Sequence, residues 1–116
     1  MQPQNQEAEK EINKAKEMLI IVEGNKDRNT LLNLGFKNIF VINETGKSLF
    51  EKIEEIEQTA GKKKVCILTD FDAKGKKLYL LLKDELSKRK VRLDNSFRQV
   101  LLKKNVSHIE GLNMAV

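Results

Sequence analysis

Three carboxylates stand where two apolar segments of the chain end. Glu23 directly follows the apolar residues 19–22, and Asp70 and Asp72 follow the apolar run that begins at Val65. Asp is among the residues least favoured inside strands, so these acids mark the points where buried strands leave a sheet. Carboxylates gathered in one crevice repel one another unless a cation lies between them. If the fold brings the three acids together, their chemistry predicts a site for Mg²⁺, a hard cation that takes oxygen ligands.

Apolar runs and helical periodicity predict the elements that would position the acids. Runs without alternating polar residues are typical of strands buried on both faces, and apolar residues near the helical period are typical of helices. The expected strands are 19–22, 39–42 and 65–69, with a fourth strand or an irregular hairpin within 91–102, and the expected helices are 7–18, 26–34, 47–60 and 73–89. Strands that alternate with helices in this way predict an α/β fold whose parallel sheet is covered on both faces.

A parallel sheet would bring Glu23 close to Asp70 and Asp72. In the commonest doubly wound strand orders the first and third strands are neighbours, and ligands bind at the carboxyl ends of the strands. Plainer interpretations exist for each residue: Asp72 could cap the helix that starts near Ala73, and Glu23 could be a loop acid or, without a metal, a general acid or base. The joint placement of the three acids favours the metal site.

Basic side chains surround the three acids. The residues expected to contact nucleic acid or phosphate are Lys26, Arg28, Lys74, Lys76 and Lys77. The whole chain has 22 basic and 17 acidic side chains, and its net charge of +5 suits a nucleic-acid partner and equally suits mere solubility. Gly24 and Gly75 follow the acids closely and would let backbone or substrate approach.

Length and composition predict one cytoplasmic domain. We expect this domain at residues 18–116 of the 116, preceded by a polar helix or extension at residues 1–17. Cys66 is the only cysteine and lies in an apolar run, which excludes an internal disulfide and predicts a buried, unreactive thiol. No apolar run approaches the ~18 residues of a membrane span, and the first residues lack the pattern of a signal peptide. We therefore expect no membrane partner.

The segments around the acids resemble two motifs of the Toprim domain, which topoisomerases, primases and certain nucleases share. The first motif is a hydrophobic strand ending in Glu-Gly, and its counterpart in this chain is LIIVEGNKDRNTLLNLGF. The second motif is Asp-x-Asp-x-x-Gly after a second hydrophobic strand, and its counterpart is VCILTDFDAKGKKL. Gly24 and Gly75 match the glycines of these motifs. Close relatives often have lysine directly after Glu-Gly, where this chain has Asn25 and then Lys26. The resemblance covers residues 18–112. It includes primase-type domains, and especially the small single-domain members and the ribonuclease that matures a ribosomal RNA.

The resemblance implies a fold and a set of site residues. The implied fold is a Toprim-like, Rossmann-like three-layer sandwich with a central, mainly parallel four-stranded sheet flanked by helices. Glu23 would be an acid/base or metal residue, and Asp70 and Asp72 would hold Mg²⁺, with Mn²⁺ as the alternative ion. The late segment HIEGL resembles an acidic segment of some members and makes Glu110 a further candidate, whereas His108 is expected to be structural or exposed.

Three functions stay open at the level of the sequence. The first hypothesis is Mg²⁺-dependent phosphotransfer on nucleic acid, in the form of a small Toprim nuclease that acts on RNA rather than DNA. The second is a non-catalytic RNA- or DNA-binding subunit of a larger processing complex, since little chain beyond the core is left to hold a substrate. The third is a receiver-like signalling domain with Asp70 as phosphate acceptor, which needs an acidic pair after the first strand and a lysine late in the chain; of the acidic pair only Glu23 is present.

Overall fold

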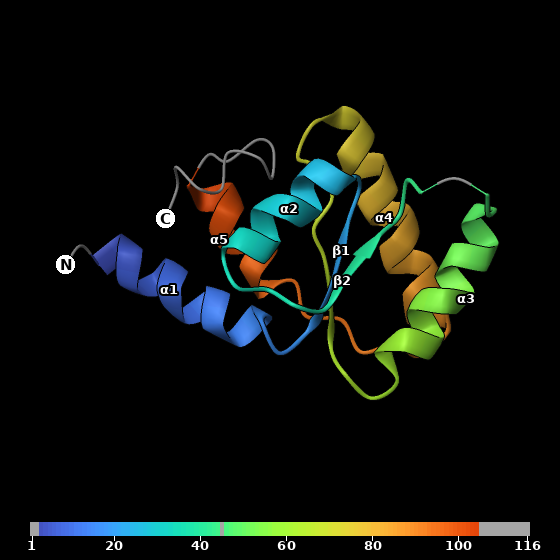
Figure 1. Ribbon diagram of the computed structural model, residues 1–116, viewed down its shortest axis with the longest axis horizontal. Coiled ribbons are helices and arrows are strands. Elements are labelled where there is room, and N and C mark those ends of the chain that lie inside the picture. The colour runs from blue at the N-terminus through green and yellow to red at the C-terminus, as the bar shows by residue number, and fades with distance from the viewer. Residues whose placement is uncertain (1–2, 45, 105–116) are drawn as a thin grey trace.

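The protein is an α/β fold in three layers. The computed structural model describes residues 3–44 and 46–104. Its elements in chain order are α1 (Pro3–Ala15), β1 (Leu19–Val22), α2 (Asn25–Asn33), β2 (Ile39–Val41), α3 (Leu49–Ala60), β3 (Val65–Ile67), α4 (Ala73–Lys88) and α5 (Ser96–Lys103). The strands form one parallel sheet in the order β2-β1-β3, with α1, α2 and α5 on one face and α3 and α4 on the other (Figure 1). The predicted α/β class with a parallel sheet between helices is confirmed.

The central strand β1 contributes to two separate apolar cores. Ile20 and Val22 lie in the core with residues of α1, α2 and α5, whereas Leu19 and Ile21 lie in the core with residues of α3 and α4. All four side chains are buried, because helices cover both faces of the sheet, so the strand has no solvent-facing position for a polar residue. Ile21 pairs with Ile67 of β3, which makes the first and third strands neighbours, as the sequence predicts.

The prediction of a fourth strand or hairpin within residues 91–102 is wrong: in the described residues the sheet has three strands. Leu93 forms an isolated parallel bridge with Val65, after which the chain turns into α5. Phe97 and Leu101 are one helical turn apart and are both buried against the sheet. Phe97, Val100 and Leu101 have the i, i+3, i+4 spacing of a helix, so the apolar pattern favours the observed helix over the predicted strand.

Helix α1 packs onto the body of the fold through its second half. Ile12 and Ala15 are buried in the same core as Ile20, and α1 contacts α5. The division of the chain into a segment at residues 1–17 and a domain at residues 18–116 stays a prediction.

Cys66 is buried in β3, as predicted. Its side chain is fully inaccessible, and burial raises the pKa of the thiol to about 12. The thiolate, which is the reactive form, is therefore not populated near neutral pH.

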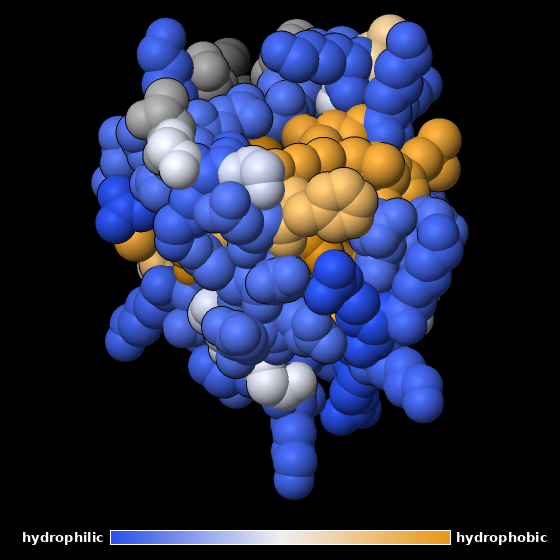
Figure 2. All heavy atoms as spheres, turned by 90° about the vertical axis from the view of Figure 1, so that its right-hand side faces the viewer, coloured by the Kyte–Doolittle hydropathy of each residue, from blue (hydrophilic) through white to orange (hydrophobic). Residues whose placement is uncertain are grey.

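The surface carries an apolar patch on the face that α3 and α4 form (Figure 2). These two helices carry three large apolar side chains that are exposed to solvent: Phe50, Leu80 and Leu81. Hydrophilic side chains surround the patch in this view. None of the helices in the described ranges is long and apolar enough to cross a membrane.

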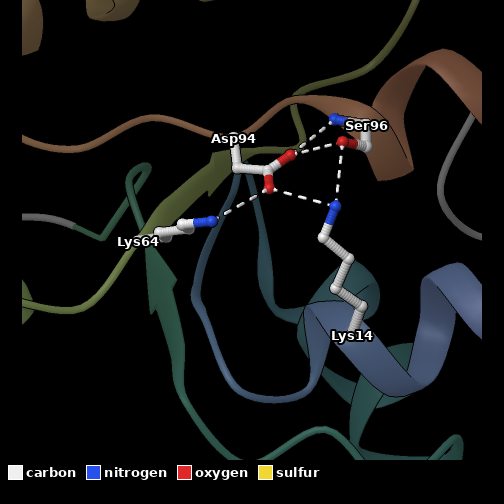
Figure 3. Close-up of polar contacts among 4 residues, drawn as sticks. All are labelled: Lys14, Lys64, Asp94 and Ser96. Carbon is white, nitrogen blue, oxygen red and sulfur yellow. Dashed lines mark hydrogen bonds and ion pairs between the residues drawn. The ribbon is translucent and has the colours of Figure 1, made fainter.

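Asp94 connects three segments that are distant in the chain (Figure 3). Its Oδ1 accepts hydrogen bonds from the Ser96 hydroxyl at 2.5 Å and the Ser96 amide at 3.0 Å, at the start of α5. Its Oδ2 lies 3.3 Å from Lys14 Nζ on α1 and 3.9 Å from Nζ of Lys64, the residue before β3. The hydrogen bond from the Ser96 hydroxyl is the main cause that lowers the pKa of Asp94.

Asp94→Asn is expected to lower the free energy of unfolding at neutral pH by about 1–2 kcal/mol, because hydrogen bonds to a charged group are lost. The native pKa of Asp94 lies below its unfolded value, so the carboxylate stabilises the fold above pH ~4. This contribution is lost as the pH falls through the lowered native pKa. Urea unfolding should therefore show a gap between wild type and variant near neutral pH that narrows in acid.

Asp84→Asn is the matched control for this experiment. Asp84 pairs with Lys88 on α4, but its side chain is 64% exposed, and exposed ion pairs contribute little. Equal losses of stability in D94N and D84N near neutral pH would contradict the role given to Asp94.

Candidate functional site

Glu23 and Asp70 lie together at the carboxyl edge of the sheet. Glu23 follows β1 and Asp70 follows β3, and these strands are hydrogen-bonded neighbours. Glu23 Oε2 accepts a hydrogen bond of 2.7 Å from the backbone N–H of Asp70, across 47 positions of the chain. Glu23 is only 8% exposed. The fold thus brings together two of the three acids that the sequence singles out.

Asp72 lies on the same loop and begins α4. Its Oδ1 accepts a hydrogen bond of 2.8 Å from the Gly75 N–H, which satisfies one of the free amides of the first helical turn. The capping interpretation of Asp72 therefore has a direct contact in its favour. Within residues 3–44 and 46–104, no three His, Cys, Asp or Glu side chains are gathered so as to hold a metal ion. A metal-ligating role for Asp72 stays a prediction.

The pair of Glu23 and Asp70 fits the needs of Mg²⁺. This ion is usually bound through one or two carboxylates, and water and substrate phosphates complete its coordination. Glu23 and Asp70 supply these two carboxylates from adjoining strand ends, so a third protein ligand is not required. The donor set is accordingly suited to a hard cation that bridges protein and phosphate.

Gly75 allows the first turn of α4 to lie against Asp70. A Cβ atom at this position would lie 2.0 Å from the Asp70 carbonyl oxygen and 2.5 Å from its carbon, far inside contact distance. The Thr69 hydroxyl also donates a hydrogen bond of 2.8 Å to the Gly75 carbonyl. At Gly24, by contrast, a Cβ atom would meet nothing within 4 Å. Close approach of a substrate at Gly24 stays a prediction.

Asp27 fixes the turn that follows Glu23, a role that the sequence analysis did not assign. The Gly24 N–H donates a hydrogen bond of 3.2 Å to Asp27 Oδ2, and Asp27 is 7% exposed. An acid three residues after a helix N-cap is a known capping pattern, so the spacing of Gly24 and Asp27 was a usable signal.

Arg98 is the other site residue that the sequence analysis missed. It comes from α5, is 3% exposed, and donates a hydrogen bond of 2.7 Å to the Thr69 carbonyl oxygen. Burial lowers the pKa of Arg98, and among the opposing influences are the negative charges of Glu23 and Asp70. The only signal in the sequence is an arginine placed among the apolar residues of one short helix.

The predicted basic contacts lie on the first turns of α2 and α4. Their side chains are all exposed: Lys26, Arg28, Lys74, Lys76 and Lys77. Both helices begin directly after the strand ends that carry the acids, and helix N-termini attract anions. The arrangement places positive charge around two central carboxylates. His108 and Glu110 lie outside the described residues.

Comparisons with known proteins agree with this architecture. A family model described as "Toprim domain" matches residues 18–102. A solved structure of a protein from Aquifex aeolicus superposes with a TM-score of 0.76 at 34% sequence identity, covering 90% of this chain and 94% of that one. No curated protein sequence matches significantly.

Proposed function

The chain belongs to the Toprim domain family, and from this premise we propose that it is a Mg²⁺-dependent phosphodiester hydrolase that cuts RNA. Toprim domains generally take part in metal-dependent processing of nucleic acids and typically bind divalent ions such as Mg²⁺. The proposal adds cleavage as the reaction and RNA as the substrate. It places the reaction in the cytoplasm.

The observation that carries the proposal is the contact between Glu23 and the Asp70 amide. Glu23 and Asp70 would hold the metal ion, and Asp72, two residues after Asp70, would be a further ligand. Mg²⁺ bound there would polarise a phosphoryl oxygen and help to orient a water. The Asp70 N–H keeps the Glu23 carboxylate turned toward the strand end, so the two acids do not have to be brought together when substrate arrives.

Binding of RNA is assigned to the exposed basic residues of α2 and α4. A lysine or arginine that contacts a phosphate contributes to affinity by releasing counterions. The basic residues stand on both sides of the acids, which suits a strand that crosses the site with its backbone held at two points. The choice of RNA over DNA rests on the likeness of the two motifs to those of the small ribonuclease members.

A specific observation also favours a second function, that of a non-catalytic RNA- or DNA-binding subunit of a larger processing complex. The described part of the chain holds no group of three His, Cys, Asp or Glu side chains that could bind a metal ion. In addition, one carboxylate oxygen of Asp72 accepts the hydrogen bond that caps α4. A domain with this arrangement would bind a nucleic-acid backbone through its basic residues, and a partner protein would supply the remaining catalytic groups.

A magnesium titration separates the two functions. End-labelled single- and double-stranded RNA and DNA are incubated with the protein over increasing Mg²⁺, with a chelator, and with Mn²⁺. We expect cleavage of RNA that requires Mg²⁺ or Mn²⁺ and stops when the ion is chelated. Binding that survives chelation, with no cleavage of any of the four substrates, would instead support the binding subunit. Asp84→Asn, an exposed change on α4, serves as the control variant and should cleave normally.

A further inference from the structure

Arg98 is a buried positive charge whose partners are mostly main-chain oxygens. Nη1 donates to the carbonyl oxygen of Thr69 at 2.7 Å, with longer contacts of 3.3 Å to the Thr69 hydroxyl and 3.4 Å to the Ile67 carbonyl. Nη2 lies 3.4 Å from the Asp70 carbonyl oxygen. A charge that is costly to bury is thus bound mainly to the chain segment where it leaves β3.

Two aromatic rings lie close to the guanidinium of Arg98. Its central carbon lies 4.5 Å from the ring centre of Phe71 and 4.2 Å from that of Tyr79. Tyr79 is fixed in turn, because its hydroxyl accepts a hydrogen bond of 3.1 Å from the Asn95 side chain. A planar guanidinium that contacts two aromatic rings has fewer orientations available than a flexible ammonium would have.

The Thr69 carbonyl that Arg98 holds belongs to the same peptide group as the Asp70 N–H that contacts Glu23. The C=O and N–H of a trans peptide lie in one plane and point in opposite directions. Arg98 therefore binds one end of this plane at 2.7 Å, while Glu23 binds the other end at 2.7 Å. Rotation of the plane would break both hydrogen bonds. A positive group on the oxygen also strengthens the N–H as a donor to the carboxylate.

We propose that Arg98 is a positioning residue that fixes the Thr69–Asp70 peptide plane and thereby keeps the Glu23 carboxylate against Asp70. Its importance for cleavage rests on the proposed function, but the positioning itself does not. Arg98 touches neither substrate nor metal in this role, and it acts through the main chain that directly follows β3.

The test is amide hydrogen exchange by NMR, without metal or substrate, in wild type, Arg98→Met and Arg98→Lys. The readout is the protection of the Asp70 amide relative to the Leu68 amide, which donates to the Ile21 carbonyl within the β1–β3 pairing. We expect this ratio to fall by about tenfold or more in R98M, as for the loss of a hydrogen bond to a charged group. R98K keeps the charge without the planar fork and should lie between R98M and wild type.

Leu101→Ala is the matched control. Leu101 is fully buried on the same helix, so its truncation destabilises the fold without touching the peptide plane. General loosening lowers the protection of both amides together and leaves their ratio unchanged. A wild-type ratio in folded R98M and R98K, or an equal fall of the ratio in L101A, would overturn the positioning role.

Failure of this inference is distinguishable from failure of the proposed function. If R98M does not fold, R98K carries the same measurement. A wild-type protein that cleaves nothing removes the proposed function and leaves the exchange ratio measurable. Conversely, normal cleavage by R98M together with an unchanged ratio removes the positioning role and leaves the nuclease standing.

Discussion

Asp70→Asn is expected to lower Mg²⁺-dependent cleavage of RNA roughly a thousandfold, since a Lewis-acid metal contributes several kcal/mol to transition-state stabilisation. The substitution removes a charge and keeps the shape of the side chain. The backbone N–H of Asp70, which contacts Glu23, is unchanged by it. Single-turnover cleavage with saturating protein measures the loss, and the urea unfolding midpoint should stay close to that of wild type.

Glu23→Gln tests the same site from the other strand. The amide oxygen of Gln can still accept from the Asp70 N–H, so the contact survives while the charge is lost. We expect a loss similar to that of D70N. If the two acids act as one unit, the double variant should be scarcely worse than either single variant. Wild-type cleavage by either single variant would remove that residue from the mechanism.

Asp72→Asn supplies the comparison that separates capping from metal binding. Asn caps helices about as well as Asp, so the start of α4 should be preserved. We expect a loss of cleavage in D72N at unchanged stability if Asp72 also ligates the metal. Full cleavage would assign Asp72 to the cap alone, without affecting the roles proposed for Glu23 and Asp70.

Gly75→Ala is expected to destabilise the protein by about 1–3 kcal/mol and to impair cleavage together with folding. Alanine is intrinsically the better helix former by roughly 1 kcal/mol, which opposes this loss. Steric overlap decides the sign, because the new Cβ would lie 2.0 Å from a main-chain oxygen that cannot rotate away. α4 or the Asp70 segment must shift, and either movement disturbs the contact with Glu23.

Gly24→Ala is the control that the chain itself offers. Gly24 also follows a site acid, but a Cβ there meets no atom within 4 Å, and its φ of −139° is open to any residue. Its stability should change by less than about 1 kcal/mol, the size of an N-cap preference. Chemical unfolding and cleavage assays on both variants provide the measurement. A G75A protein as stable and active as G24A would contradict the close packing at Gly75.

Much of the fold was predictable because its strands are unbroken apolar runs. Helices cover both faces of β1, so this strand needs no polar position, and the same holds for β3. From three such strands separated by helices, the neighbouring positions of β1 and β3 follow by topology. That rule also brings Glu23 to Asp70, although they are far apart in the sequence.

The parts that escaped prediction depend on tertiary contacts. α5 has only eight residues, and the helical spacing of Phe97, Val100 and Leu101 was not recognised in so short a segment. Arg98 is paired largely with main-chain carbonyls, and no residue type marks such partners in a sequence. Asp72 stands two residues after Asp70 and directly before α4, so its position suits a metal ligand and a helix cap alike. The hydrogen bond from the Gly75 N–H supports the cap, and only the structure shows it.

The contact between Glu23 and Asp70 also has a consequence for the order in which the protein is made and folds. It joins residues 47 positions apart, and such distant contacts form more slowly than local helical ones. A growing chain that has left the ribosome only as far as β2 contains Glu23 but neither the amide nor the carboxylate of Asp70. The acidic pair is therefore complete only after β3 has been synthesised and has joined β1. A nascent chain that ends before β3 would thus lack the site on which the proposed function depends.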